Sequence, residues 1–126
     1  MTVPAARILI CDDEPALREL MRIALVGDYE FEEAGTVAEA IEIAERFRPD
    51  VVLVDVMMPG GSGLDVIRYV ADHPALGNPA SVVVSAFAAE ADQEEAREAG
   101  AAAFVSKPFD PDELSATVAS LIGNGR

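Results

Sequence analysis

The run Val51–Val54, which leads into Asp55 and then into Pro59-Gly60-Gly61, restricts the fold more than any other stretch of the chain. Four apolar β-forming residues in succession predict a strand buried on both faces, as in a parallel sheet covered by helices. The proline and the glycines then turn the chain. In open α/β sheets, ligands bind beyond the carboxyl ends of the strands, so Asp55 is expected at the edge that carries the chemistry. Taken alone, however, Asp55 is more simply explained as a turn residue or a helix cap.

The rest of the chain repeats this alternation of apolar runs and helical patterns. Strands are expected at residues 8–11, 30–34, 51–55, 81–85 and 103–106. Five helices with apolar residues at three- and four-residue spacing follow them and begin near residues 15, 37, 64, 90 and 111. In the first helix the apolar stripe is formed by Leu17, Leu20, Met21 and Ala24. Strands that alternate with helices through short loops predict a doubly wound α/β fold, with a five-stranded parallel sheet between two layers of helices. The second strand is rich in glutamate, which is typical of a sheet edge facing water.

Length and composition predict one globular domain. The 126 residues are 51% hydrophobic, which allows a substantial core but no second domain. We therefore expect residues 1–126 to form a single domain with its core at about residues 6–122. The apolar runs are too short to span a membrane, and the N-terminus lacks the features of a signal peptide. Cys11 is the one cysteine and has no partner for an internal disulfide, which favours a reducing cytoplasm.

The charge of the chain limits its partners. The formal net charge is −14, so direct binding to nucleic acid or to an anionic membrane is not expected. An acidic surface suits divalent cations and basic faces of other proteins.

Polar side chains stand at the carboxyl ends of four of the five predicted strands. They are Asp12 and Asp13 after the first, Asp55 after the third, Ser85 at the end of the fourth and Lys107 after the fifth. These ends meet at one edge of a parallel sheet, so the side chains should converge. Three clustered carboxylates repel one another unless a cation compensates them, and Mg²⁺ prefers such oxygen ligands. The lysine and the serine can contact a phosphoryl group, which together predicts phosphoryl transfer with Asp55 as nucleophile.

Over nearly its whole length, the sequence resembles the CheY-like receiver domain of two-component response regulators. The resemblance rests on four motifs in register at successive strand ends: Asp12-Asp13, Asp55 with Met58-Pro59-Gly60, Ser85-Ala86 and Lys107-Pro108-Phe109. It implies a flavodoxin-like fold with strand order 2-1-3-4-5, which places the acidic second strand at an edge. It also implies a phosphorelay protein of the cytoplasm that promotes its own phosphorylation and dephosphorylation and does not turn over external substrates.

The resemblance implies a role for each site residue. Asp55 would take the phosphoryl group from a phosphohistidine of a sensor histidine kinase or a phosphotransfer protein. Asp13, Asp55 and the backbone carbonyl of Met57 would bind Mg²⁺ directly, and Asp12 would act largely through water. Lys107, turned inward by a cis bond to Pro108, would contact the phosphoryl group. The switch residues are Ser85 and Phe104, which would move towards the phosphate and into the space that is vacated.

Some positions depart from the family pattern and carry expectations of their own. Phe104 lacks the hydroxyl group that many members have there, and Gly60-Gly61-Ser62-Gly63 makes a more flexible loop beside the site. Met57 and Phe87 follow Asp55 and Ser85 by two positions, and neither side chain can orient an attacking water. We therefore expect slow self-hydrolysis of the aspartyl phosphate. The helix at residues 90–99 has little beyond Ala88, Ala91, Ala96 and Ala99 to bury, so it should shift at low cost and form an output face with the last strand and the last helix.

Two other functions fit parts of the pattern. A phosphatase of the haloacid dehalogenase type also combines Asp, Ser, Lys and Mg²⁺, but it carries its nucleophile in an Asp-x-Asp motif after the first strand, where this chain has adjacent Asp12-Asp13 and no cap insertion. A pseudo-receiver that serves only as a scaffold would not need the intact acidic cluster. The output partner of the switch is an unidentified protein or an attached effector domain, and a phosphorylation-dependent dimer is a further alternative that the sequence leaves open.

Overall fold

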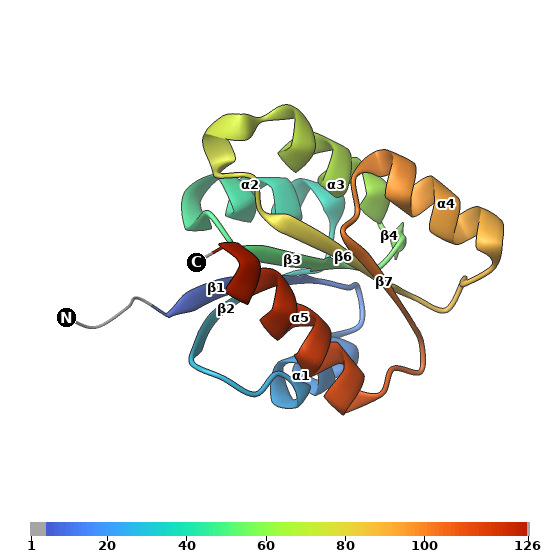
Figure 1. The fold of residues 1–126 in the computed structure, drawn as a ribbon. Coiled ribbons are helices and arrows are strands. Elements are labelled where there is room, and N and C mark those ends of the chain that lie inside the picture. The colour runs from blue at the N-terminus through green and yellow to red at the C-terminus, as the bar shows by residue number, and fades with distance from the viewer. Residues whose placement is uncertain (1–4, 126) are drawn as a thin grey trace.

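The computed structural model describes residues 5–125 and has a parallel sheet between two layers of helices (Figure 1). The main sheet contains β1 (Ala6–Cys11), β2 (Tyr29–Ala34), β3 (Val51–Val54), β6 (Ala80–Ser85) and β7 (Ala103–Ser106). A small hairpin is made by β4 (Met57–Met58) and β5 (Gly61–Ser62). The helices are α1 (Pro15–Ala24), α2 (Val37–Phe47), α3 (Gly63–Asp72), α4 (Glu90–Ala99) and α5 (Pro111–Gly125), with a 3-10 turn at Pro74–Leu76.

The strand order confirms the predicted fold class. The order is β2-β1-β3-β6-β7, which corresponds to 2-1-3-4-5 when only the main sheet is counted, and every neighbouring pair is parallel. The glutamate-rich β2 is an edge strand, as its composition predicts. Helices α1 and α5 cover one face of the sheet, and α2, α3 and α4 cover the other (Figure 1). The chain reverses direction across the sheet between β1 and β3, which is where doubly wound folds place their ligands.

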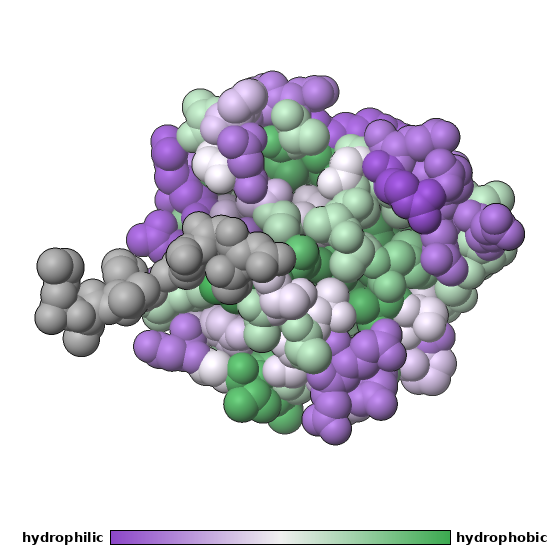
Figure 2. All heavy atoms as spheres, viewed as in Figure 1, coloured by the Kyte–Doolittle hydropathy of each residue, from purple (hydrophilic) through white to green (hydrophobic). Residues whose placement is uncertain are grey.

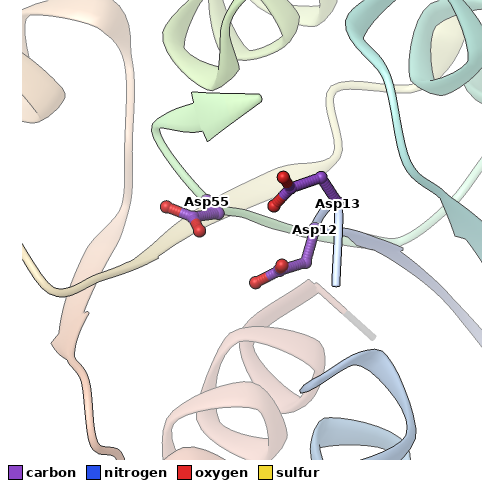
Figure 3. A group of neighbouring side chains, drawn as sticks. All are labelled: Asp12, Asp13 and Asp55. Atoms are coloured by element: carbon purple, nitrogen blue, oxygen red, sulfur yellow. The ribbon is translucent and has the colours of Figure 1, made fainter. Parts of the chain in front are cut away.

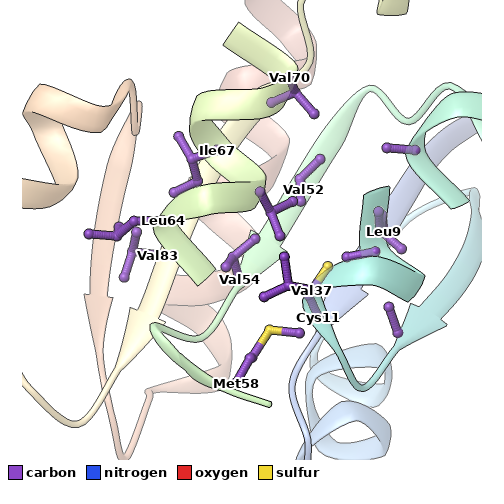
Figure 4. Packing of buried hydrophobic residues seen from close by; sticks show 14 of the residues in the cluster. Leu9, Cys11, Val37, Val52, Val54, Met58, Leu64, Ile67, Val70 and Val83 are labelled. Atoms are coloured by element: carbon purple, nitrogen blue, oxygen red, sulfur yellow. The ribbon is translucent and has the colours of Figure 1, made fainter. Parts of the chain in front are cut away.

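The apolar strands serve two cores at once. Alternate residues of β3 point to opposite faces, so Val52 and Val54 pack under α2 and α3 whereas Val51 and Leu53 pack under α1 and α5. All four are fully buried. Figure 4 shows the core on the side of α2 and α3, where Val54 lies among side chains from both helices. This two-sided burial explains why the strand is a continuous apolar run and not an alternating one.

Helix caps fix the loops at the functional edge. Thr36 Oγ1 accepts a hydrogen bond from Glu39 N at 3.1 Å, which is one of the two bonds of a capping box. The Glu39 carboxylate, however, accepts from Gly35 N and not from Thr36 N. Asp110 Oδ1 accepts from Asp112 N at 2.8 Å and so caps the N-terminus of α5.

Three details differ from the sequence predictions. Residues 57–62 pair as the β4–β5 hairpin where only a loop was expected. Leu20 belongs to the predicted apolar stripe of α1, but 53% of it is exposed because the stripe is wider than the surface that α5 covers. In α4 only Ala96 and Ala99 are buried, so this helix is held by even less apolar contact than its composition predicts.

Candidate functional site

Backbone hydrogen bonds beyond the sheet hold the predicted site residues at its carboxyl edge. Asp55 N donates to Cys11 O at 2.9 Å, and Lys107 N donates to Ser85 O at 2.9 Å. Each bond continues the hydrogen-bonding of the sheet by one step past the end of a strand. The side chains of Asp55 and Lys107 are therefore presented by rigid backbone and not by free loops.

The three acidic side chains converge as the sequence predicts. One carboxylate oxygen from each of Asp12, Asp13 and Asp55 lies within 4.8 Å of the other two, and the three side chains face a common space (Figure 3). Asp12 is fully buried, Asp55 is 8% exposed and Asp13 is exposed to solvent. Clustered carboxylates of this kind are suitable ligands for a hard divalent cation, and the exposed Asp13 leaves a side from which it can enter.

Lys107 supplies the positive charge of this cluster. Its Nζ atom donates to Asp12 Oδ2 at 2.7 Å and to Asp55 Oδ2 at 2.8 Å. Burial alone would lower the pKa of Lys107, but the hydrogen bonds and charges of the two carboxylates outweigh burial and raise the pKa above its ordinary value. The lysine is thus a cation at neutral pH. The peptide bond between Lys107 and Pro108 is cis, which confirms the expectation drawn from the family resemblance.

The carboxylate oxygens of Asp12 and Asp55 that do not contact Lys107 accept hydrogen bonds from loop amides. Asp55 Oδ1 accepts from Met57 N at 3.2 Å, and Asp12 Oδ1 accepts from Glu14 N at 2.9 Å. In each buried acid, one carboxylate oxygen therefore accepts from a backbone amide of the loop that follows it, and the other accepts from Lys107 Nζ. This arrangement leaves both carboxylates with a fixed direction, because a rotation would break two bonds at once.

The predicted switch residues lie on neighbouring strands. Ser85 is fully buried at the end of β6, and its Oγ accepts from Phe87 N at 3.1 Å, so the hydroxyl belongs to the β6–α4 turn. Phe104 on β7 is partly buried and packs against the core under α2, α3 and α4. Met57 and Phe87, the two positions that depart from the family pattern, are 60% and 55% exposed at the rim of the site.

Two positions that the sequence analysis missed also shape the site. A Cβ atom on Gly63 would lie 1.9 Å from the backbone oxygen of Asp55, so α3 can begin this close to Asp55 only with glycine at that position. Arg18 on α1 donates from Nη1 to Asp12 O at 2.6 Å and from Nε to Glu33 Oε1 at 2.9 Å. Arg18 thereby connects the loop that carries Asp12 to Glu33 near the end of β2. The contact could not be found from sequence spacing, since it joins three separate elements.

Comparison with known proteins points to one family. The model for the response regulator receiver domain matches residues 8–119. The chain is 29% identical over 122 residues to the polar-differentiation response regulator DivK of Brucella anthropi, covering 97% of this chain and 99% of DivK. It is 40% identical over 114 residues to the DNA-binding response regulator MtrA of Mycolicibacterium smegmatis, covering 89% of this chain and 48% of MtrA. The chain thus spans nearly all of the first relative but about half of the second.

A solved structure carries the same arrangement of elements. The REC domain of AraT, a response regulator from Geobacillus stearothermophilus, superposes with a TM-score of 0.81 at 31% sequence identity, covering 94% of this chain and 93% of that domain. Over the described residues, each helix is too short or too polar to cross a lipid bilayer.

Proposed function

Because the chain belongs to the response regulator receiver domain family, we propose that it accepts a phosphoryl group on Asp55 and switches its output face in response. The observation that carries this proposal is the double hydrogen bond of Lys107 to Asp12 and Asp55 beside the exposed Asp13. It brings a nucleophilic carboxylate, a fixed cation and spare oxygen ligands into one small space. Phosphoryl transfer needs this set of groups, because it depends on positioning and on compensating charge.

In the proposed reaction, Asp55 attacks phosphorus with its carboxylate oxygen. A P–O bond forms to Asp55 while the P–N bond of the donor phosphohistidine breaks, and the imidazole nitrogen keeps the electron pair of that bond. Lys107 leaves the Asp55 carboxylate and pairs with the transferred phosphoryl group, which carries more negative charge. Residues Asp13, Asp55 and the Met57 carbonyl would hold a Mg²⁺ ion directly, with Asp12 acting through water. When bound, the ion would neutralise charge that builds up on the phosphoryl oxygens.

The donor is a sensor histidine kinase or a phosphotransfer protein, and the groove between α1 and α5 is suited to it. This groove has a volume of about 700 Å³ and is lined by apolar side chains of α1 together with Lys107, Pro108 and Phe109. Ile23 and Val26 on its α1 side are 69% and 77% exposed, and Figure 2 shows hydrophobic surface beside α1. A helix of the donor that fills this groove would bury that surface and bring its phosphohistidine next to Lys107.

The output follows from the change in charge at Asp55. Ser85 would give up the hydrogen bond that its Oγ accepts from Phe87 N, and its hydroxyl group would donate a hydrogen bond to the phosphoryl group. Phe104 would follow into the vacated space. Helix α4 buries only two alanines, so it can move with this turn at little cost. The face formed by α4, β7 and α5 is then the surface that an output protein, an attached effector domain or a second copy would read.

Residues 1–126 would act as one receiver domain in the cytoplasm, with its core at residues 6–122. The chain would catalyse its own phosphorylation and dephosphorylation without turning over external substrates.

The test is transfer from a small-molecule donor. The protein is incubated with acetyl phosphate and Mg²⁺, and intact-mass spectrometry is used to count added phosphoryl groups. We expect one group, with labelling lost on removal of Mg²⁺ and in Asp55→Asn, but kept in Asp72→Asn, which makes the same substitution at an exposed site. Folding of each variant is checked by circular dichroism. An unlabelled wild type that folds and binds Mg²⁺ would refute the proposal in favour of a scaffold, and steady turnover of small phosphate esters would instead indicate a phosphatase.

A further inference from the structure

A second pocket lies at the rim of the acidic site, on the side away from the α1–α5 groove. It has a volume of about 190 Å³ and is lined by Val56, Met57, Leu64, Phe87, Asp92 and Glu95. Its walls are formed by the segment after β3, the first turn of α3, the loop after β6 and the first turns of α4. None of its lining residues also lines the α1–α5 groove.

The apolar half of the pocket is left open to water. Met57 is 60% exposed and Phe87 is 55% exposed, although both side chains are large and the chain has an otherwise strongly acidic surface. Exposed apolar area of this kind contributes binding free energy when another molecule covers it. The methionine side chain is flexible and adapts to the shape of an occupant, and the ring of Phe87 offers a flat face.

The other half of the pocket is acidic. Asp92 and Glu95 are three residues apart on α4, so both side chains can reach the same pocket. Neither belongs to any ion pair found in residues 5–122, whereas the one arginine of α4, Arg97, pairs with Glu94. Helix α4 carries five acidic residues against this one arginine, and Figure 2 shows strongly hydrophilic surface over it.

We propose that this pocket receives an arginine side chain of a partner protein. The three methylene groups of arginine match the apolar wall of Met57 and Leu64, and the guanidinium group can lie over the Phe87 ring while it donates to Asp92 and Glu95. Asp92 Oδ2 accepts from Ala89 N at 3.1 Å, but a neutral side chain in the pocket would leave Asp92 and Glu95 without a counter-charge. An acidic one would be repelled by them and by the net charge of −14.

An arginine in this pocket would touch both loops of the functional site. Met57 N donates to Asp55 Oδ1, and Phe87 N donates to Ser85 Oγ, so two of the residues that would contact the arginine are each bonded to a site residue. The partner would therefore sense the state of the site, and would do so while the α1–α5 groove is occupied. The pocket does not need phosphorylation in order to bind, so this inference is independent of the function proposed above.

The methyl group of Met57 makes the inference testable by NMR. The protein is labelled with ¹³C at its methionine methyl groups and titrated with Nα-acetyl-arginine methylamide. We expect a saturable shift of the Met57 signal with a dissociation constant in the millimolar range, and unchanged signals from the buried Met21 and Met58. The neutral analogue Nα-acetyl-norleucine methylamide should give a much smaller shift at equal concentration.

Matched charge variants separate this pocket from the general acidity of the chain. The double variant Asp92→Asn/Glu95→Gln should bind the arginine compound about three- to tenfold more weakly, because two ion pairs at a partly exposed site are lost. Glu94→Gln/Glu98→Gln removes the same charge from the same helix outside the pocket and should change the affinity less than about twofold. Equal affinities of the two double variants, equal shifts by the norleucine compound, or an unmoved Met57 signal would each overturn the inference.

Discussion

Replacing Lys107 with methionine should destabilise the unphosphorylated protein and make its stability depend strongly on Mg²⁺. Methionine keeps the length and the apolar stem of the side chain but removes the cation that bridges Asp12 and Asp55. Asp12 is fully buried and Asp55 nearly so, so both carboxylates would remain in the protein without their counter-charge. Leaving a buried charge without its partner is among the costlier changes that a single substitution can make.

The magnitude follows from the two bonds that are lost. A hydrogen bond to a charged group contributes about 1.5–3 kcal/mol, and removal of one member of a fully buried ion pair costs about 3–5 kcal/mol. The cluster opens to water beside Asp13, which lets solvent screen part of the repulsion. We therefore expect a loss of about 2–3 kcal/mol in the free energy of unfolding, which for a chain of this size lowers the Tm by about 10 °C.

Urea and thermal unfolding followed by far-ultraviolet circular dichroism measure this loss. Arg97→Met is the matched control, because it removes a cation from an exposed ion pair on α4 and should cost about 0.5 kcal/mol or less. Millimolar Mg²⁺ should stabilise Lys107→Met more than the wild type, since the ion no longer competes with the lysine for the same oxygens. A Lys107→Met protein as stable as the wild type without Mg²⁺ would refute this account of the cluster.

The pH dependence has a defined sign. The raised pKa of Lys107 means that its contribution to stability is fully present below the ordinary lysine pKa of 10.5 and is lost as the pH rises through the higher folded value. The difference in stability between the wild type and Lys107→Met should thus be constant from about pH 7 to pH 9 and close only in strong alkali. A difference that vanishes near neutral pH would contradict the pairing.

Three further predictions concern other positions. Gly63→Ala should cost about 3 kcal/mol or more in urea unfolding, because the new methyl group meets the backbone at 1.9 Å, whereas Gly60→Ala, which has open space around it but a positive φ, should cost only about 1 kcal/mol. Burial raises the pKa of the Cys11 thiol, so a thiol reagent at pH 8 should label the folded protein no faster than it unfolds; rapid labelling would contradict the buried position. The phosphorylated protein should lose its phosphate slowly, as followed by intact mass over time, and Met57→Asn should speed this loss by about tenfold because the amide can orient water. Fast loss of phosphate from the wild type would contradict the inference that Met57 cannot orient an attacking water.

The sequence predicts the fold and the set of converging residues because both depend on local patterns. The apolar runs that end in Asp12, Asp55, Ser85 and Lys107 identify strands that are buried on both faces, and the carboxyl ends of such strands must share an edge. The structure places them there. The cis bond before Pro108 was expected from the family resemblance alone, since no pattern in the residues indicates it.

What the sequence did not predict depends on contacts between distant elements. Arg18 reads as an ordinary surface residue of an amphipathic helix, yet it joins the Asp12 carbonyl to Glu33 on β2. Gly63 reads as part of a flexible glycine-rich loop, yet it is required by the close approach of α3 to Asp55. Leu20 was expected in the core but is exposed in the α1–α5 groove. Periodicity shows which residues are apolar on a helix face and does not show how much of that face a neighbour covers.

The central claim is that Asp55, and neither of the acids beside it, carries the phosphoryl group. The most direct measurement is to phosphorylate the protein with acetyl phosphate and Mg²⁺, reduce the acyl phosphate with borohydride and sequence the peptides by mass spectrometry. Reduction converts the modified aspartate to homoserine. Homoserine at position 55 alone is the result that this account predicts, and homoserine at Asp12 or Asp13 would contradict it.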